Sequence, residues 1–339
     1  MEQHDIQQQF FAHIKKNLPP HLSFVDTIAE LLNISNDSAY RRIRGEKQLS
    51  FEEIKNLCAH FSISVDQMLN LKSDAAIFNG HYITADNFNL KEYLEDIRRN
   101  ISQIISFPSK ELFYFCKDIP IFLYYMYPEL TAFKYFIWMK TLLQFPQYVN
   151  TKFSLRKMTE PAIVDLGRQI GELYVQLPSH EIMNVDNIMT TLRQVEYYKE
   201  ANLFESEEDF MAIYDKLEAM IDHMEKQTEA GVKFMPGTAP NVKSARLHVY
   251  INDFVVGDNT NLVILNDSKV CFVVHNTINL IHTRDQRYTD YTFQFLQNII
   301  KKSMLISGVS ERERTRFFNL MRSRIKICRN NQFETLGKP

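Results

Sequence analysis

The chain contains few of the residues that build covalent, metal or phosphate sites. Its 339 residues include only four cysteines and nine glycines. Cys58, Cys116, Cys271 and Cys328 show no C-x-x-C spacing, so we expect free thiols in a reducing compartment. The glycines are too dispersed to cradle a phosphate, and no P-loop, GxGxxG, GxSxG or HExxH motif occurs. These absences predict that the chain is not an enzyme and uses no cofactor.

The sequence also lacks a long hydrophobic run and a surplus of charge. Its most apolar stretch, 119–143, is interrupted by prolines and charged residues, so it cannot cross a bilayer without burying charge. The polar start Met1-Glu2-Gln3-His4 is not a signal peptide, which favours a cytoplasmic location. The net charge of −2 gives the whole chain no general affinity for polyanions. Binding to a nucleic acid would therefore have to come from a local patch.

The composition is that of a folded protein with more than one domain. Hydrophobic residues make up 45% of the chain and charged residues 24%. Helical periodicity is lost between 73 and 90, which marks a linker. We therefore expect an N-terminal domain over 1–72, a second domain over 91–235 and a third over 236–339.

Residues 1–72 contain five short amphipathic segments, several of them with helix-capping residues. Ser50 and Glu53 have the spacing of a capping box, as have Ser64 and Gln67. Capped segments of this length predict a small five-helix bundle. The helices are expected at about 6–18, 23–32, 35–45, 50–61 and from 64 onward.

The second and third segments meet through the short connection Asn33-Ile34-Ser35, which predicts a helix-turn-helix. Four stretches follow in order across 5–71: Ala29–Ser35, Arg44–Lys47, Leu49–Ile54 and Phe61–Leu69. With them, this layout resembles the phage-repressor (Xre or Cro-like) type of helix-turn-helix DNA-binding domain. Two positions depart from that family, which usually has Gly at Asn33 and an aliphatic residue at Arg42. Asn tolerates a left-handed backbone, and we expect the buried position to move to Ile43.

The resemblance implies that 35–45 is a recognition helix in the major groove of double-stranded DNA. It also implies binding as a homodimer, because one short helix reads too few base pairs to be selective. The local charge agrees, since four of the eight Lys and Arg of residues 1–72 fall between 41 and 47. The residues implied nearest the bases are Asn36, Asp37, Tyr40 and Arg41, and those implied at phosphates are Ser38, Arg42, Arg44 and Lys47.

Residues 91–235 predict an irregular all-helical domain for regulation or oligomerisation. The aromatic stretch 113–138 favours a helical core over an effector pocket served by Asp118, Glu129 and Lys134. A heptad spacing from Phe210 to Met224 favours packing within the domain over dimerisation. Helices are expected at about 91–106, 130–144, 161–176, 186–203 and 206–229.

Residues 236–339 change to period-two patterning, which predicts an antiparallel meander followed by helices at 288–305 and 310–329. This part is expected to sense a ligand or to dimerise. The last helix is basic and could contact DNA, dock on the acidic stretch 196–229 of the same or a partner chain, or face solvent. Cys271, His275 and His282 form only a loose set of metal-ligand types, so no metal site is expected.

These patterns predict a mainly α fold with a small C-terminal α+β part. The expected function is a cytoplasmic, sequence-specific DNA-binding transcriptional regulator that binds an operator as a dimer. Residues from 91 onward would oligomerise the chain and respond to an unknown small-molecule effector. The alternative is a protein-interaction adaptor or antitoxin-like factor in which the N-terminal bundle docks a protein.

Overall fold

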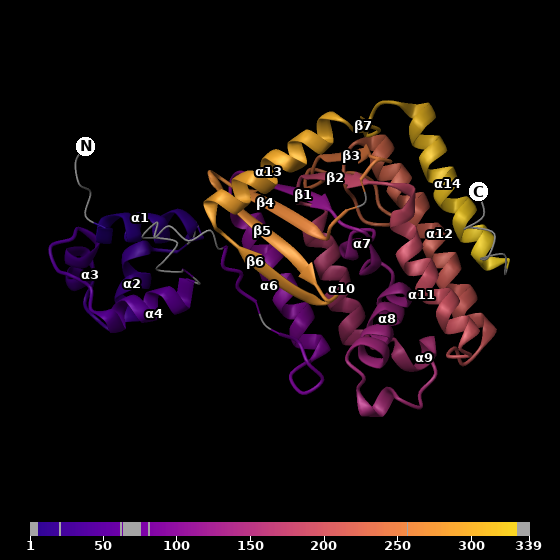
Figure 1. Cartoon of the computed structure of the whole chain (residues 1–339), viewed down its shortest axis with the longest axis horizontal. Helices are drawn as coiled ribbons and strands as arrows, with labels where there is room; N and C mark the ends of the chain where they lie inside the picture. Colours follow the sequence, from indigo (N-terminus) through magenta and orange to yellow (C-terminus); the bar gives the residue numbers. More distant parts are fainter. Residues whose placement is uncertain are drawn as a thin grey trace.

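The chain forms an N-terminal bundle, residues 6–61, and a larger body, residues 76–330 (Figure 1). None of the described helices is long and apolar enough to cross a membrane. The expected fifth N-terminal helix, from Ser64 onward, lies outside the described residues. The computed structural model describes residues 6–19, 22–61, 63, 76–80, 82–255 and 257–330.

The N-terminal bundle has its own hydrophobic core. Ile14, Ile28 and Ala39 are fully or almost fully buried in a cluster separate from that of the body. The capping box at the start of α4 is confirmed, because Ser50 N–H donates to Glu53 Oε2 and Glu53 N–H donates to Ser50 Oγ. The helices of the bundle are α1 (Ile6–Asn17), α2 (Phe24–Leu32), α3 (Asn36–Ile43) and α4 (Phe51–Phe61).

The body is built on a seven-stranded mixed sheet of order β6-β5-β4-β1-β2-β3-β7. The central strand β1 is parallel to β2, with Phe113 opposite His180, and antiparallel to β4, with Leu112 opposite Val263. The strands are β1 (Lys110–Phe115), β2 (Ser179–Met183), β3 (Leu247–Ile251), β4 (Thr260–Leu265), β5 (Ser268–His275), β6 (Asn279–Thr283) and β7 (Met304–Leu305).

The expected mainly α fold with a small C-terminal β part is wrong, because one sheet takes strands from both 91–235 and 236–339. Strands β1 and β2 lie within the segment expected to be all helical. They are short and largely buried, so they lack the alternation that identifies a half-exposed strand. Strand β3 is also not part of the antiparallel meander, since it pairs in parallel with β2. The overall class is α/β.

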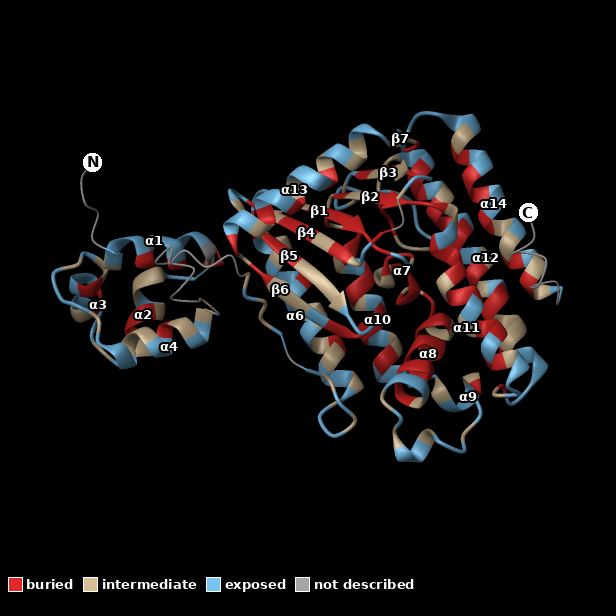
Figure 2. Cartoon of the chain, viewed as in Figure 1, coloured by how far each residue is buried: buried red, intermediate tan, exposed pale blue. Residues whose placement is uncertain are grey.

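Helices cover both faces of the sheet (Figure 1). Helix α13 (Gln286–Lys301) packs on one face, where its Leu296 meets Phe113, Leu262 and Cys271. The main core lies on the other face, and Figure 2 shows the buried residues concentrated in the sheet and α8. The remaining helices are α6 (Leu90–Ser106), α7 (Ile121–Tyr124), α8 (Pro128–Ile137), α9 (Leu155–Met158), α10 (Pro161–Tyr174), α11 (Met189–Glu200), α12 (Glu207–Ala230) and α14 (Glu311–Arg329), with short turns η1 (Trp138–Leu142), η2 (Pro146–Tyr148) and η3 (Val185–Ile188).

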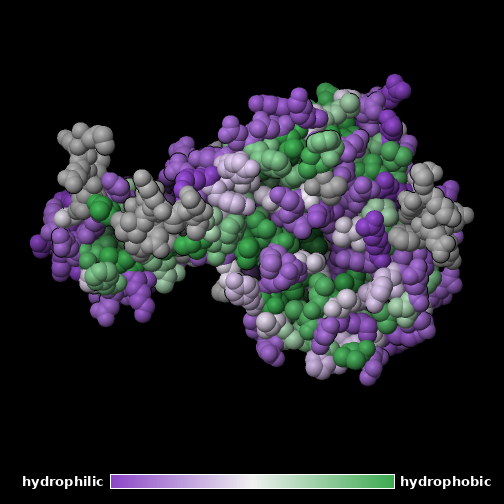
Figure 3. All heavy atoms as spheres, in the orientation of Figure 1, coloured by the Kyte–Doolittle hydropathy of each residue, from purple (hydrophilic) through white to green (hydrophobic). Residues whose placement is uncertain are grey.

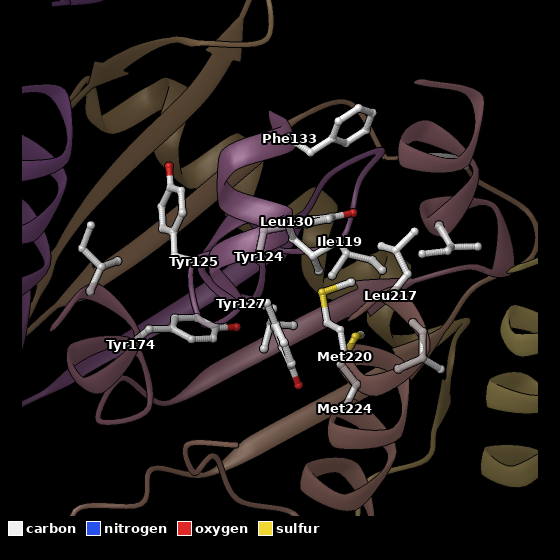
Figure 4. Packing of buried hydrophobic residues seen from close by; sticks show 14 of the residues in the cluster. Ile119, Tyr124, Tyr125, Tyr127, Leu130, Phe133, Tyr174, Leu217, Met220 and Met224 are labelled. Carbon is white, nitrogen blue, oxygen red and sulfur yellow. The ribbon is translucent and has the colours of Figure 1, made fainter. Parts of the chain in front are cut away.

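The aromatic stretch 113–138 belongs to the core, as expected. Tyr124 and Phe133 are completely buried, and they belong to the same core cluster as Leu217 and Met220 of α12, part of which Figure 4 shows. The heptad seam of α12 therefore packs inside the body, as the sequence favoured. Lys134 is also buried, and its Nζ lies 2.7 Å from Asp118 Oδ2. This ion pair links α8 to the loop between β1 and α7.

The basic helix α14 docks on the acidic helix α12 of the same chain. Arg322 pairs with Asp222 at 2.8 Å and also with Glu225. Arg329 pairs with Asp215 at 2.7 Å. Of the three alternatives for this helix, the structure therefore shows docking within the chain. The acidic stretch of α12 is thereby partly neutralised.

Candidate nucleic-acid interface

The turn between α2 and α3 fixes the direction in which α3 leaves the bundle core. Asn33 ends α2 in a left-handed conformation, with φ 52° and ψ 50°, so Asn performs here the task for which Gly is usual. Ile34 N–H donates to Ala29 O at 3.0 Å, which closes the turn. The side chain of Ser35 then caps α3 by accepting a hydrogen bond from Ser38 N–H.

The start of α3 is tied to α2 by a side-chain hydrogen bond. Asn36 Nδ2 donates to Asp26 Oδ1 at 2.8 Å. Both residues are exposed or half-buried, so the bond lies at the surface of the bundle. This bond uses one of the two amide hydrogens of Asn36 and leaves the Asn36 amide oxygen available to accept another hydrogen bond. Asn36 is therefore oriented but still able to contact a ligand.

Most of the predicted contact residues lie together on the exposed side of α3 and of the loop that follows it. We call these residues the α3 face. Tyr40 is 48% exposed, and the side chains of Arg41 and Arg44 are 57% and 67% exposed. Figure 3 shows a mainly hydrophilic surface at the end of the bundle farthest from the body. The α3 face consists of Asn36, Asp37, Tyr40, Arg41, Arg44 and Lys47; Ser38 is half-buried beside it.

The cationic part of the α3 face is pre-oriented by neighbouring side chains. The Arg44 guanidinium lies 5.7 Å from the centroid of the Tyr40 ring, in cation–π contact. Glu46 lies 3.8 Å from both Arg41 and Arg44. These exposed pairs are weak, so the two arginines can exchange Glu46 for another anion at little cost.

Arg42 does not belong to the α3 face, and its prediction as a phosphate contact needs correction. The residue is only 5% exposed, and its Nη2 lies 2.7 Å from Glu53 Oε1 on α4. Its Nη1 donates to Ser38 O at 3.2 Å. Arg42 therefore fills the position where the resembling family buries an aliphatic residue. The expected shift of that position to Ile43 is wrong, since Ile43 is only partly buried.

The ion pair changes the acidity of Glu53. Burial alone would raise the pKa of this carboxyl, but hydrogen bonds from Arg42 and from Ser50 N–H outweigh that effect and lower it. Glu53 is therefore ionised at neutral pH, and its negative charge balances the buried guanidinium of Arg42. The α4 capping box and the inner side of α3 are thus joined through one carboxylate.

Two glutamines of α1 position the loop after α3, a role that no sequence pattern predicts. Gln7 Nε2 donates to the carbonyl oxygens of Arg42 and Lys47, both at 2.7 Å. Gln7 Oε1 accepts from Leu49 N–H at 2.9 Å. Gln8 Nε2 donates to Arg44 O at 2.8 Å. Polar residues on an amphipathic helix normally face solvent, so only the structure reveals this role.

Comparison with known proteins does not identify the chain. No family model matches it, and neither does any curated protein or solved structure. The chemistry of its own residues is therefore the basis on which a function can be assigned.

The loose metal-ligand set does not converge in the structure. Cys271 is buried on the sheet face covered by α13. His282 is opposite Phe272, whose side chain lies on the other face of the sheet. Within the described ranges, no group of three or more His, Cys, Asp or Glu side chains is arranged to hold a metal ion.

Two polar clusters in the body were not predicted. Lys233 is completely buried, with its Nζ 3.4 Å from Glu181 Oε1 and 3.5 Å from the centroid of the Tyr174 ring. Burial lowers the pKa of Lys233 to about 8, although Glu181 opposes the change. On the α13 side of the sheet, His180 Nε2 lies 2.8 Å from Glu111 Oε1. The first cluster joins β2 to α10 and to the loop after α12, and the second joins β1 to β2.

Proposed function

We propose that the chain is a sequence-specific DNA-binding transcriptional regulator whose N-terminal bundle inserts α3 into the major groove. The observation that carries the proposal is the α3 face. It combines Asn, Tyr and Arg side chains able to contact base edges with flanking cations able to contact phosphates. The buried Arg42–Glu53 pair supports it, because this pair fixes the rotation of α3.

The geometry suggests a division of roles within the α3 face. Asn36, Asp37, Tyr40 and Arg41 lie on the first two turns of α3, the part of a recognition helix that meets base edges. Arg44 and Lys47 follow the helix and are suited to contact the phosphates on either side of the groove. Ser38 is a further residue able to donate a hydrogen bond to a phosphate. Arg42 acts through Glu53 as a positioning residue.

A single α3 is too short to select an operator alone. The helix has eight residues, enough to reach only a few base pairs. Two bundles on half-sites about 34–36 Å apart would double the readout. In this proposal the body joins two chains and sets the spacing of their bundles.

The experiment is selection of random double-stranded DNA by the full-length protein. Arg41→Ala tests the α3 face, and Arg316→Ala is the matched control, because its side chain is 74% exposed on α14 and carries the same charge. We expect an enriched sequence with two half-sites for wild type and Arg316→Ala, and weaker enrichment with a relaxed base preference for Arg41→Ala. Equal enrichment by all three proteins would disprove the assignment of α3.

The second candidate is a protein-interaction adaptor, favoured by the mixed charge around α3. Asp26, Glu30 and Asn36 line a shallow groove of about 540 Å³ beside the α3 face. A surface of both signs suits a protein partner better than a polyanion. Absence of any DNA enrichment at low salt, together with a partner protein whose binding is lost in Arg41→Ala, would favour this function.

A further inference from the structure

A groove of about 830 Å³ lies between α6, the segment that precedes α6, and strands β4–β6. This volume is in the range of small-molecule sites, roughly 300–1,000 Å³. Polar residues such as Asn87, Asn89 and Gln103 form part of its lining. The apolar part of the lining includes Phe88, Tyr93, Ile97, Ile104, Val270 and Phe272.

One cation in this groove has no counter-ion among the residues that the structure describes. Arg284 follows β6 directly, and burial lowers the pKa of its guanidinium. Among the described residues, no carboxylate forms an ion pair or hydrogen bond with it. Its charge adds to the effect of burial in lowering the pKa of the neighbouring His282. The buried Arg42 is balanced by Glu53, whereas Arg284 is not balanced.

Arg284 is half-buried, and its partly desolvated guanidinium lines the groove, where an anionic ligand could pair with it. The charges of the groove indicate what would balance it. The lining carries two carboxylates, Glu92 and Asp96, and two guanidinium groups, Arg99 and Arg284. Asp96 is already paired with Arg99. A single negative charge on a ligand would match Arg284, whereas a doubly charged phosphate would add an unmatched charge to a lining that already contains Glu92.

We propose that the groove binds an organic monocarboxylate with an apolar body. The carboxylate pairs with the Arg284 guanidinium, whose planar fork suits two parallel hydrogen bonds. The hydrocarbon lies on the apolar lining, beside Tyr93, Ile97 and Phe272. Burial of the hydrocarbon supplies most of the affinity, and Arg284 supplies the selectivity for an acid over an alcohol.

The groove wall includes the chain that connects the body to the N-terminal bundle. Asn79 exchanges two backbone hydrogen bonds with His282, both 2.7 Å long. A Cβ atom at Gly80 would lie 2.7 Å from Ile281 Cγ2, so glycine permits this close approach to β6. The Arg284 charge also contributes, after burial, to the lowered pKa of His13 on α1. A ligand at Arg284 thus lies where the bundle and the body meet.

Occupancy of the groove is therefore expected to change the arrangement of the N-terminal bundle and its affinity for an operator. This regulatory part rests on the proposed DNA-binding function. A ligand has such an effect only if it binds the DNA-competent and incompetent arrangements unequally. The binding of a carboxylate can be measured without DNA, so the two proposals fail separately.

The first test is calorimetric titration of the full-length protein with decanoate, with 1-decanol and decyl phosphate as comparisons. We expect decanoate to bind at least about tenfold more tightly than 1-decanol, because only the acid can pair with the guanidinium. Affinity should rise at least about twofold per methylene from hexanoate to decanoate. Absence of decanoate binding, or tighter binding of decyl phosphate, would overturn the proposal.

The second test uses two matched charge variants. Arg284→Gln should lower decanoate affinity at least about tenfold, while Arg316→Gln, which removes the same charge from an exposed position on α14, should change it less than about twofold. Because no described carboxylate pairs with Arg284, Arg284→Gln should melt no lower than wild type. Ile97→Trp narrows the groove and leaves Arg284 intact, so it should also abolish binding. Unchanged decanoate affinity in folded Arg284→Gln or Ile97→Trp protein would overturn the assignment.

Discussion

Arg42 Nη2 lies 2.7 Å from Glu53 Oε1 on the inner side of α3, directly behind the face proposed to contact DNA. The pair joins α3 to α4 where an aliphatic contact would otherwise be expected. It leaves Arg41 and Arg44, the neighbouring arginines, on the exposed side. The rotation of α3 is therefore determined by an ion pair as well as by the core residue Ala39.

Arg42→Ala should lower the free energy of unfolding of the N-terminal bundle by about 2–3 kcal/mol, because it leaves the Glu53 carboxylate without its partner. The double variant Arg42→Leu/Glu53→Leu should recover most of this loss, since neither charge remains. Urea unfolding followed by circular dichroism would measure both. Trp138, the sole tryptophan, is buried in the body, so its fluorescence should not shift. A double variant less stable than Arg42→Ala would contradict this account.

The left-handed turn at Asn33 gives a second stability prediction. Asn33→Gly should be neutral or should stabilise the bundle slightly, because Gly adopts this conformation without strain. Asn33→Ala should cost about 1 kcal/mol, because its Cβ opposes a positive φ. Both values come from the same urea titration. If the two variants were equally stable, the left-handed backbone at Asn33 would not determine the stability of the bundle at this position.

Contacts to phosphates and to bases should be separable by their salt dependence. Lys47→Ala should weaken DNA binding on all sequences and reduce the slope of log K against log salt by about 1. Arg41→Ala should instead cost about 1–3 kcal/mol on the selected operator and relax the preference at one base pair. Lys55→Ala, an exposed lysine on α4, is the control and should change neither quantity. Binding isotherms at several salt concentrations would measure these effects.

Lys233 makes the stability of the body depend on pH. In the folded chain its pKa is lowered to about 8, whereas the ordinary value is 10.5. Between these values the unfolded chain binds more protons, so the free energy of unfolding rises with pH. From pH 7.5 to 9 wild type should gain about 1 kcal/mol over the variant Lys233→Met/Glu181→Gln. Unfolding followed by Trp138 fluorescence would measure this, and equal pH slopes would refute it.

The helices could be predicted from the sequence because each carries its own signals. The spacing of Ile6, Phe10 and Ile14 and the capping residues Ser35 and Ser50 are local, and the helices lie close to the expected positions. The strand β1 could not be predicted in this way. It is largely buried within an aromatic-rich stretch, and its partner β4 is far away in the sequence. Propensity and periodicity do not report such a distant pairing.

The candidate site shows the same limit. The exposed positions of Tyr40, Arg41 and Arg44 follow from helical spacing once Ala39 is known to be buried. The inward position of Arg42 depends on Glu53, which lies on another helix and has no sequence signal linking it to Arg42. The contacts of Gln7 and the unpaired Arg284 likewise depend on residues brought together only by the tertiary fold.

The central place of β1 also affects how the chain emerges from the ribosome. The described residues of the bundle core extend only as far as Ile63, so this part can fold early in synthesis. Strand β1 cannot pair with β4 until Thr260–Leu265 has been translated. During that interval the aromatic residues around Phe133 have no complete core to enter, and a nascent chain is then most dependent on chaperones. A stop codon before β4 would leave a folded bundle attached to an aggregation-prone remainder.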